Sequence, residues 1–367
     1  MKIATVFGTR PEAIKMAPIV KELERRSIPH LTIVTAQHRE MLDQKLEVFN
    51  ITPDYDLDIM QHNQDLFYVT SAVLNEIKPV LLKEKPDVVL VQGDTTTVFG
   101  TSLAAFYLGI KVGHVEAGLR TWNKMNPFPE EMNRQLTSRL TDFHFAPTEW
   151  SKKNLLKEGI KPETIFVTGN TVIDALLMIV DPNYKFTEPP LDKIDFENRK
   201  IILLTCHRRE SFGEQMGNIF SACRTLVETN PDVELVYPVH PNPQVQKKAS
   251  EILANVPRVN LIEPVEYRRF VQLMNKCYLI LTDSGGIQEE APSVGKPVLV
   301  LRKTTERPEA IEAGTAKLVG TEKNDIVREA QKLLSERPAY LEMATKANPY
   351  GDGKAAQRIV DVLTEHR

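Results

Sequence analysis

Residues 87–118, "DVVLVQGDTTTVFGTSLAAFYLGIKVGHVEAG", decide the fold class. Residues 87–94 are a short apolar run that ends at a Gly-Asp pair, and residues 95–109 have the length and composition of a helix. Residues 111–118 are a second apolar run that also ends in a loop. A strand, a helix and a strand in succession predict one unit of a parallel sheet that helices cover on both faces.

The same alternation continues on both sides of this stretch. Further apolar runs that end in loops lie at residues 2–8, 30–36, 143–148 and 164–171, and an amphipathic helix is expected over residues 11–26. Residues 181–200, which are rich in proline and charge, predict a surface connector. A second series of apolar runs follows at residues 200–207, 233–241, 259–264, 278–286, 297–303 and 316–320.

We therefore expect an α/β protein with two Rossmann-like, doubly wound domains that face a cleft. Residues 1–172 would form the first domain and residues 173–352 the second, and the helix in residues 353–367 would pack back on the first. In such sheets ligands bind at the carboxyl ends of the strands. The cleft between two such edges is the expected binding site.

Length and charge narrow the class of protein. A chain of 367 residues is long enough for two cores. Its formal net charge of −3 gives no support to nucleic-acid binding, which usually needs a basic face. No apolar run approaches the roughly 20 residues that span a bilayer, and the first residues lack the pattern of a signal peptide. We expect a cytoplasmic enzyme with no membrane partner and no nucleic-acid partner.

Cofactor motifs are missing from the sequence. There is no GxGxxG after a strand, no P-loop and no HExxH, and the "HVE" at residues 114–116 lacks the PCxxC half of a zinc deaminase site. The three cysteines, Cys206, Cys223 and Cys277, form no CxxC and predict reduced core thiols. We expect neither a metal nor a redox cofactor.

Acidic residues follow several strands of the first domain. Asp94 ends the run at 87–94, Glu116 ends the next strand, and Glu130 and Glu131 begin a predicted helix. Three of them have a structural alternative: Asp94 as a helix N-cap, and Glu130 and Glu131 as partners of a helix dipole. Carboxylates at successive strand ends of one sheet would instead converge on one cleft, as general acid–base chemistry requires.

Cations stand at helix starts, where they oppose the helix dipole. Arg10 and Lys15 flank the start of the helix that begins near Pro11, and Arg307 precedes another helix that starts with proline. They are either solvated surface cations or contacts for a bound anion. The charge of such an anion would make these positions favourable.

The stretch "LTDSGGIQEEAPSVGKP", residues 281–297, combines an anion cradle with acids. Backbone N–H groups of Ser284, Gly285 and Gly286 can hold a phosphate, and glycine permits its close approach. Glu290, one turn later, can accept both hydroxyls of a ribose, although compensation of the helix dipole is the alternative. A phosphate cradle beside a diol acceptor indicates a nucleotide. His207, at another strand end with two arginines after it, is a candidate diphosphate contact.

Several long motifs together resemble the non-hydrolysing UDP-N-acetylglucosamine 2-epimerase family. They are "FGTRPEAIKMAP", "TAQHREMLDQ", "QGDTTT", "GHVEAGLRT", "PEEMNR", "GNTVIDAL", "HRRESFG" and "TDSGGIQEEAPSVGKPVLVLRKTTERPEA". The resemblance runs from residue 1 to about residue 360. It implies the glycosyltransferase-B type of fold and interconversion of UDP-N-acetylglucosamine and UDP-N-acetylmannosamine without a cofactor. It also implies a cytoplasmic homodimer that serves bacterial surface polysaccharide synthesis.

The resemblance also implies roles for individual residues. The catalytic group would be Asp94, Glu116, Glu130 and His207. UDP would be held by Phe270 at the uracil, Glu290 at the ribose, and, at the diphosphate, Arg10, Lys15, His207, Arg307 and the loop of Ser284, Gly285 and Gly286. A second UDP-N-acetylglucosamine, which activates bacterial members, would bind near Gln37, His38, Arg39, Glu40, Gln64, Arg208 and His240. There the match is incomplete, because Glu40 and Asn63 stand where some members have Gln and Arg.

The implied reaction removes the hydrogen at sugar C2, which no carbonyl acidifies. Departure of UDP from C1 would make this possible and give 2-acetamidoglucal, to which UDP adds back. Asp94 and Glu130 are the expected proton-transfer groups, and Glu116 would exchange protons or support positive charge at C1. Three alternatives remain: a hydrolysing 2-epimerase, an epimerase of another UDP-N-acetylated sugar, and a UDP-dependent glycosyltransferase of the same fold.

Overall fold

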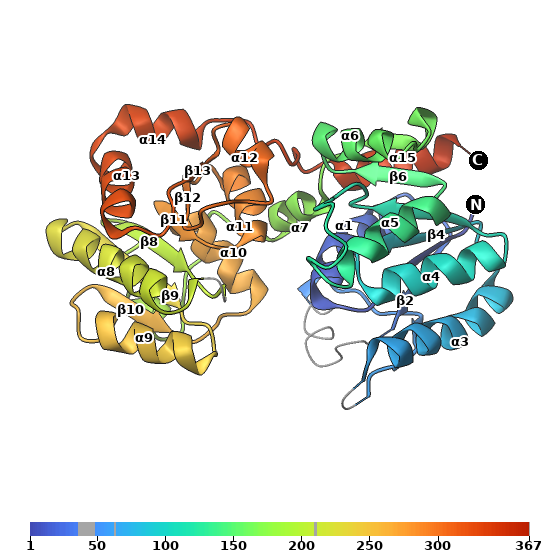
Figure 1. Cartoon of the computed structure of the whole chain (residues 1–367), viewed down its shortest axis with the longest axis horizontal. Helices are drawn as coiled ribbons and strands as arrows, with labels where there is room; N and C mark the ends of the chain where they lie inside the picture. The colour runs from blue at the N-terminus through green and yellow to red at the C-terminus, as the bar shows by residue number, and fades with distance from the viewer. Residues whose placement is uncertain (36–47, 62–63, 209–210, 367) are drawn as a thin grey trace. The chain divides into compact units, whose positions relative to one another are not determined.

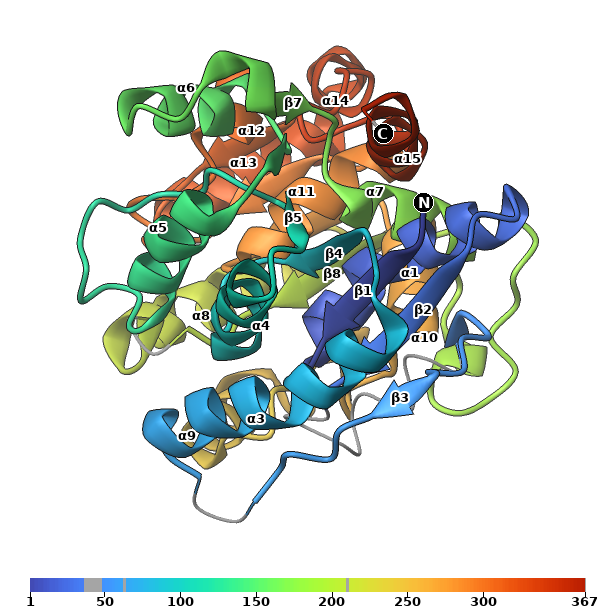
Figure 2. The same cartoon turned by 90° about the vertical axis from the view of Figure 1, so that its right-hand side faces the viewer.

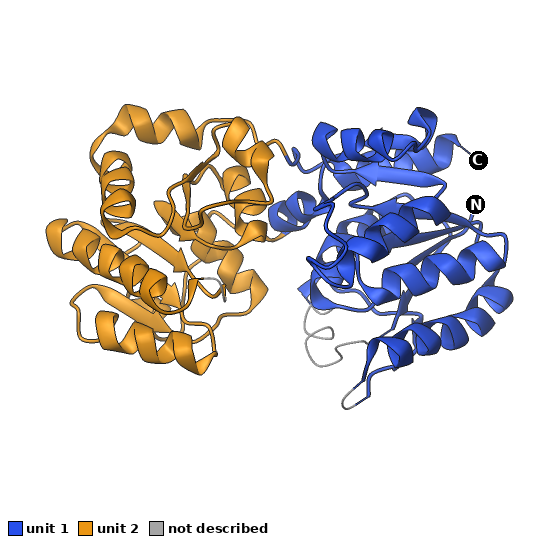
Figure 3. Ribbon diagram, viewed as in Figure 1, with its two compact units in different colours: residues 1–178, 350–367 blue, residues 179–349 orange. Residues whose placement is uncertain are grey.

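The computed structural model describes residues 1–35, 48–61, 64–208 and 211–366. It divides the chain into two compact units (Figure 3). The first consists of residues 1–178 and 350–367, and the second of residues 179–349. The first unit therefore contains both ends of the chain.

The first unit, which carries the labels β2, β4 and β6 in Figure 1, is built on a seven-stranded parallel sheet. The strand order in this sheet is β3-β2-β1-β4-β5-β6-β7. Its strands are β1 (Ile3–Phe7), β2 (His30–Val34), β3 (Tyr55–Asp56), β4 (Val88–Gln92), β5 (Lys111–Val115), β6 (Phe143–Ala146) and β7 (Ile165–Val167). Its helices are α1 (Arg10–Arg25), α3 (Leu66–Glu84), α4 (Thr96–Tyr107), α5 (Glu130–Leu140), α6 (Glu149–Lys157), α7 (Thr171–Ile179) and α15 (Ala355–Glu365), with a 3₁₀ turn at Pro162–Thr164.

Right-handed crossovers place the helices of this unit in two layers. The helices α3, α4 and α5 lie side by side on one face of the sheet (Figure 2), and α1 and α15 pack together on the other. The strands between these layers are mainly apolar, and all five residues of β4 are buried. The prediction from residues 87–118 is confirmed by β4, α4 and β5.

The last helix, α15, is fastened to this unit at both ends. The buried Asp174 carboxylate of α7 accepts hydrogen bonds from the backbone N–H groups of Ala355 and Ala356, at 3.2 and 2.8 Å. Near the other end, the Arg26 guanidinium forms an ion pair with Asp361 at 2.6 Å. A carboxylate at the first N–H groups of a helix satisfies donors that have no partner within the helix.

The second unit has a six-stranded parallel sheet with the order β10-β9-β8-β11-β12-β13. Its strands are β8 (Lys200–Thr205), β9 (Val233–Pro238), β10 (Val259–Ile262), β11 (Leu279–Thr282), β12 (Val298–Val300) and β13 (Ala316–Leu318). Its helices are α8 (Glu214–Thr229), α9 (Pro243–Leu253), α10 (Tyr267–Lys276), α11 (Gly285–Glu290), α12 (Pro308–Glu312), α13 (Lys323–Ser335) and α14 (Arg337–Ala344), with 3₁₀ turns at Leu191–Lys193 and Ala291–Val294.

The three cysteines lie in the interior of the second unit. Cys206, Cys223 and Cys277 are buried and free of disulfides. Burial raises the pKa of the Cys223 and Cys277 thiols to about 12, so both stay protonated at neutral pH. The prediction of core thiols is confirmed. In the parts of the chain described, no helix combines the length and the apolar character needed to cross a bilayer.

Candidate functional site

In each sheet there is one pair of neighbouring strands from which the crossover connections lead toward opposite edges of the sheet. In the first unit this pair, the switch point of the sheet, is β1 and β4, and in the second it is β8 and β11. The segments that leave these four strands carry residues 8–10, 93–95, 206–208 and 283–286. Doubly wound sheets bind ligands at such switch points. Most residues that the sequence nominated therefore lie at, or next to, one of the two switch points.

Glu116 follows β5 and is only 8% exposed. Its carboxylate accepts a hydrogen bond from the Gln92 side chain at 2.9 Å and forms an ion pair with the Lys15 ammonium of α1. A buried carboxylate needs such partners to remain charged. The backbone of Glu116 has φ = 65°, a left-handed conformation that strains a residue with a side chain. Strain of this kind persists where neighbouring structure enforces it, which is typical of functional sites.

Asp94 is not used as a helix cap. The N-cap of α4 is Thr95, whose hydroxyl accepts the Val98 N–H at 3.4 Å. The Asp94 carboxylate is 27% exposed and forms an ion pair with Arg134 at 2.7 Å. Asn133 donates to the Asp94 carbonyl at 2.9 Å. The structural alternative for Asp94 is therefore wrong, and its carboxylate lies in a charged, partly open position.

The two glutamates at the start of α5 differ. The Glu131 carboxylate is fully buried and accepts the backbone N–H groups of Thr121 at 2.9 Å and Trp122 at 3.2 Å. Glu130 is half-buried, and its carboxylate makes no hydrogen bond or ion pair with any part of the chain that the structure describes. Glu131 is therefore a structural anchor for the preceding loop, whereas the Glu130 carboxylate is available to a ligand.

Glu12 joins the two loops of the first switch point. It is 2% exposed, and its carboxylate accepts the N–H groups of Gly8 at 2.8 Å and Thr9 at 2.7 Å, and the Thr95 hydroxyl at 2.5 Å. Burial raises the pKa of Glu12, although these hydrogen bonds oppose the rise. Arg10, which follows the same loop, is exposed. Glu12 thus fixes the loop that carries Arg10 against the loop that carries Asp94.

His114, the histidine of the "HVE" motif, is structural. Its Nε2 atom lies 2.7 Å from the Gly93 carbonyl oxygen, and the ring is 1% exposed. Burial lowers the pKa of His114 to about 4, so the ring is neutral at physiological pH. The histidine supports the loop before Asp94 from the core.

A cavity of about 220 Å³ opens at the switch point of the second unit. The imidazole rings of His207 and His240 stack there with centroids 5.4 Å apart and planes 11° apart. The residues that line the cavity are Thr205, Cys206, His207, Pro238, His240, Pro241, Pro264, Val265, Phe270, Ser284 and Ile287. Four residues named from the sequence, His207, His240, Phe270 and Ser284, thus line one small, largely apolar space.

The loop of Ser284, Gly285 and Gly286 lies between a cation and an acid. A Cβ atom built on Gly285 would lie 3.9 Å from the Arg307 guanidinium carbon, and one on Gly286 would lie 3.9 Å from the Glu290 Oε1 atom. Arg307 also forms an ion pair with the buried Glu289. Of the two acids in α11, Glu289 is therefore the counter-ion of the arginine, while Glu290 approaches the glycine loop.

Sequence reasoning missed Asp283, which precedes this loop. Its carboxylate is fully buried and accepts the N–H groups of His207 and Arg208, both at 2.7 Å. Burial lowers the pKa of His207, and the nearby Asp283 charge opposes that effect. An acid at the end of a buried strand, directly before Ser-Gly-Gly, was the signal that could have identified it.

The candidate activator residues are only partly described. Gln37, His38, Arg39, Glu40 and Asn63 lie outside the described residues. Gln64 belongs to the first unit, where its side chain accepts the Gln61 N–H at 3.1 Å. Arg208 and His240 belong to the second unit.

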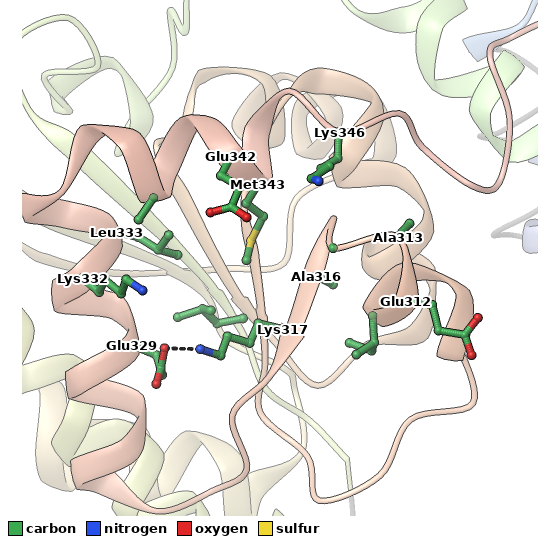
Figure 4. A pocket seen from close by; sticks show the side chains of 14 residues that line it. Glu312, Ala313, Ala316, Lys317, Glu329, Lys332, Leu333, Glu342, Met343 and Lys346 are labelled. Carbon is green, nitrogen blue, oxygen red and sulfur yellow. Dashed lines mark hydrogen bonds and ion pairs between the residues drawn. The ribbon is translucent and has the colours of Figure 1, made fainter.

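A second cavity, of about 370 Å³, lies in the second unit among α12, β13, α13 and α14 (Figure 4). Its wall carries the Lys317–Glu329 ion pair at 2.5 Å. Its other lining residues include Glu312, Lys332, Glu342 and Lys346. None of the residues that the sequence nominated lines this cavity, so it is separate from the candidate site.

Known proteins match this chain over its whole length. The family model described as UDP-N-acetylglucosamine 2-epimerase matches residues 21–364. UDP-N-acetylglucosamine 2-epimerase of Escherichia coli K12 is 54% identical over 381 aligned positions, which cover 100% of this chain and 99% of that protein. The crystal structure of UDP-GlcNAc 2-epimerase from Neisseria meningitidis bound to UDP-GlcNAc has a TM-score of 0.89 and 52% identity, and the match covers 100% of both chains.

A more distant structure bears on the fold alone. The glycosyltransferase of kitacinnamycin has a TM-score of 0.68 at 12% identity, over 99% of this chain and 98% of that one. The predicted α/β fold of the glycosyltransferase-B type is therefore confirmed. The match of the family model, together with 54% identity to the Escherichia coli protein, shows that the chain belongs to the UDP-N-acetylglucosamine 2-epimerase family.

Proposed function

We propose that this enzyme interconverts UDP-N-acetylglucosamine and UDP-N-acetylmannosamine by elimination of UDP and its re-addition. The observation that carries the proposal is the full-length identity of 54% with the Escherichia coli UDP-N-acetylglucosamine 2-epimerase. The Neisseria meningitidis relative, bound to UDP-GlcNAc, supports the same substrate.

The reaction must overcome the weak acidity of the hydrogen at C2. Direct removal of that proton would leave a carbanion with no carbonyl to stabilise it. Loss of UDP from C1 supplies the driving force, because the C2 proton then leaves as the C1–C2 double bond of 2-acetamidoglucal forms. UDP adds back to C1 while a proton reaches the opposite face of C2, and this restores the nucleotide sugar.

The second unit has the groups to hold UDP. The cavity lined by Phe270 would take the uracil, and the Glu290 carboxylate would accept the ribose hydroxyls. The loop at Ser284–Gly286, Arg307 and His207 would contact the diphosphate, because cations and N–H donors stabilise the charge that grows on a leaving phosphate. From the first unit, Arg10 and Lys15 would add further positive charge.

The first unit has the acids. Glu130 has a carboxylate without a partner among the described residues, and Asp94 is partly exposed beside Arg134. We assign proton transfer at C2 to these two groups. The partners of Glu116 include Lys15 and Gln92, which favour its charged form. This suits it to support positive charge at C1, with proton exchange as its alternative role.

Incubation with UDP-N-acetylglucosamine in D₂O tests the proposal. We expect NMR to show deuterium at C2 of both UDP-sugars, because the proton removed from C2 exchanges with solvent before one returns. The nucleotide sugar should persist throughout the time course. Interconversion of the isomers with no deuterium at C2 would refute the elimination mechanism.

The same time course separates the alternatives. A hydrolysing 2-epimerase would accumulate free N-acetylmannosamine and UDP. A glycosyltransferase would not interconvert the isomers without an acceptor. Turnover that is much faster with another UDP-N-acetylated sugar would reassign the substrate.

We also propose that the enzyme is a cytoplasmic homodimer that pairs through α3 and α4. Phe106 and Tyr107 at the end of α4 are 58% and 71% exposed, and Tyr107 lines a groove of about 330 Å³ between the two helices. Exposed apolar clusters of this kind mark interaction surfaces. The free thiols of the second unit support a reducing compartment.

Light scattering after size-exclusion chromatography tests the dimer. We expect twice the chain mass of 41.6 kDa for the wild type, and Tyr107→Asp combined with Phe106→Asp should shift it to the monomer, because charge is costly to bury in such a contact. Leu341→Asp is the control, since this 40% exposed residue lies in the second unit. A wild-type mass of one chain, or a dimer that survives the double substitution, would contradict this interface.

A further inference from the structure

Asp283 ties the ends of two neighbouring strands together. It directly follows β11, and its own N–H donates to the Thr205 carbonyl at 3.1 Å. One carboxylate oxygen, Oδ2, accepts the N–H groups of His207 and Arg208. These contacts set the backbone of the segment that follows β8, and they use only one of the two carboxylate oxygens.

The other oxygen, Oδ1, is buried and has no hydrogen-bond partner among the described residues. The His207 ring lies close to this oxygen, with its Nδ1 atom 3.4 Å away. An acceptor left without a donor in the interior is costly, and a small rotation of the ring would supply one. The His207 side chain is 38% exposed and lines the cavity of about 220 Å³, where a ligand could meet its other nitrogen, Nε2.

We propose that Asp283 is a positioning residue for His207: its Oδ1 atom accepts the Nδ1–H of the imidazole and thereby presents Nε2 to the departing diphosphate. This rests on the proposed function, in which His207 contacts that group. A carboxylate behind a histidine fixes which ring nitrogen carries the proton and stabilises the imidazolium. His207 can then hold a proton at Nε2 and share it with the oxygen of UDP as the C1–oxygen bond breaks.

The charges around His207 favour this arrangement. Asp283 approaches from the end of β11, His240 stacks from the segment after β9, and Arg208 and the Cys206 thiol lie on the same segment as His207. Within this described set Asp283 is the only carboxylate, and Arg208 and His240 oppose protonation. Removal of the Asp283 charge would therefore leave the imidazolium without a counter-ion.

Asp283→Asn tests the proposal, because it separates the charge from the backbone contacts. The amide oxygen can still accept the N–H groups of His207 and Arg208, while the NH₂ group faces Nδ1 and demands the opposite tautomer. We expect kcat/KM to fall by about tenfold or more. The pKa that governs the basic limb of its pH profile should fall by about one unit. UDP affinity should stay within about threefold of the wild type, because both backbone contacts remain.

The matched control is Asp195→Asn. Asp195 also accepts two backbone N–H groups, from Asn198 at 3.0 Å and Glu197 at 3.3 Å, but it lies in the connector at residues 181–200. Its substitution should leave the pH profile unchanged. An Asp283→Asn enzyme with the wild-type pH profile and kcat/KM would reduce Asp283 to a backbone anchor and overturn the proposal.

NMR of protein labelled with ¹⁵N in histidine tests the tautomer without any turnover. The His207 signals, assigned by their loss in His207→Gln, should show a proton on Nδ1 and none on Nε2 in the neutral ring of the wild type. A wild-type ring with its proton on Nε2 overturns the proposal even if Asp283→Asn does not fold. Failure of the proposed epimerase activity would appear instead as absent interconversion in D₂O, with the tautomer unaffected.

Discussion

The substitutions Asp94→Asn, Glu116→Gln and Glu130→Gln are each expected to lower kcat by about 10²-fold or more. Each amide keeps the size of the side chain but cannot take up a proton as a base or carry the charge that the reaction requires. UDP affinity should largely survive, because the groups assigned to the nucleotide lie mainly in the second unit. Steady-state kinetics with UDP-N-acetylglucosamine and calorimetric titration with UDP measure the two effects separately.

The surroundings of these acids predict a difference among the three variants. Glu116→Gln removes the carboxylate charge that pairs with the Lys15 ammonium, so some loss of folding stability is expected. Glu130→Gln breaks no hydrogen bond or ion pair with a described residue, so its thermal stability should match the wild type. Glu149→Gln is the control, because this exposed acid lies in the first turn of α6, as Glu130 lies in the first turn of α5. Near-normal kcat in all three variants would remove the acid–base group from the mechanism.

Arg307→Ala is expected to weaken UDP binding by about 10- to 100-fold, the equivalent of about 1.5–3 kcal/mol for a hydrogen bond to a charged group. The guanidinium lies beside Gly285, where a diphosphate on the glycine loop would meet it. His207→Ala should also lower UDP affinity, since it removes a donor from the same cavity. Calorimetric titration at fixed pH and ionic strength measures both.

A second variant separates two reasons for the loss. Glu289 is 3% exposed and forms an ion pair with Arg307. Arg307→Ala therefore removes the positive charge that compensates this buried carboxylate. If the guanidinium contacts the diphosphate, the double variant Arg307→Ala, Glu289→Gln should bind UDP as weakly as Arg307→Ala alone. If the guanidinium only neutralises Glu289, the double variant should regain the UDP affinity of the wild type. Arg337→Ala is the matched control, because Arg337 also precedes a proline at a helix start, in α14. Unchanged UDP affinity in Arg307→Ala would end the phosphate role of Arg307.

The fold was predictable because the burial of a strand restricts the residue types within that same short segment of the sequence. A parallel strand covered on both faces must be apolar throughout, so β4 and β8 stand out as short apolar runs. Asp94 and the glycine loop were predictable for a related reason. Polar residues directly after such runs must lie at the carboxyl edge of the sheet.

The partners of these residues were not predictable, because they come from distant parts of the chain. Arg134 reaches Asp94 across 40 residues, Glu12 reaches Thr95 across 83, and Asp283 reaches His207 across 76. No periodicity or spacing encodes such pairs; they follow from the order in which the strands are arranged. The sequence therefore indicated the acids that we propose to act on a ligand but not the groups that hold them in place.

The return of α15 to the first unit has a consequence for biosynthesis. This helix is synthesised after the second unit, residues 179–349, which is a single uninterrupted segment of the chain. The N–H groups that Asp174 accepts, and the carboxylate that Arg26 binds, become available to the first unit only after the second unit has been synthesised. The first unit therefore lacks one of its helices while the second unit already has its whole sequence and can fold, although domains usually fold in the order in which they are made.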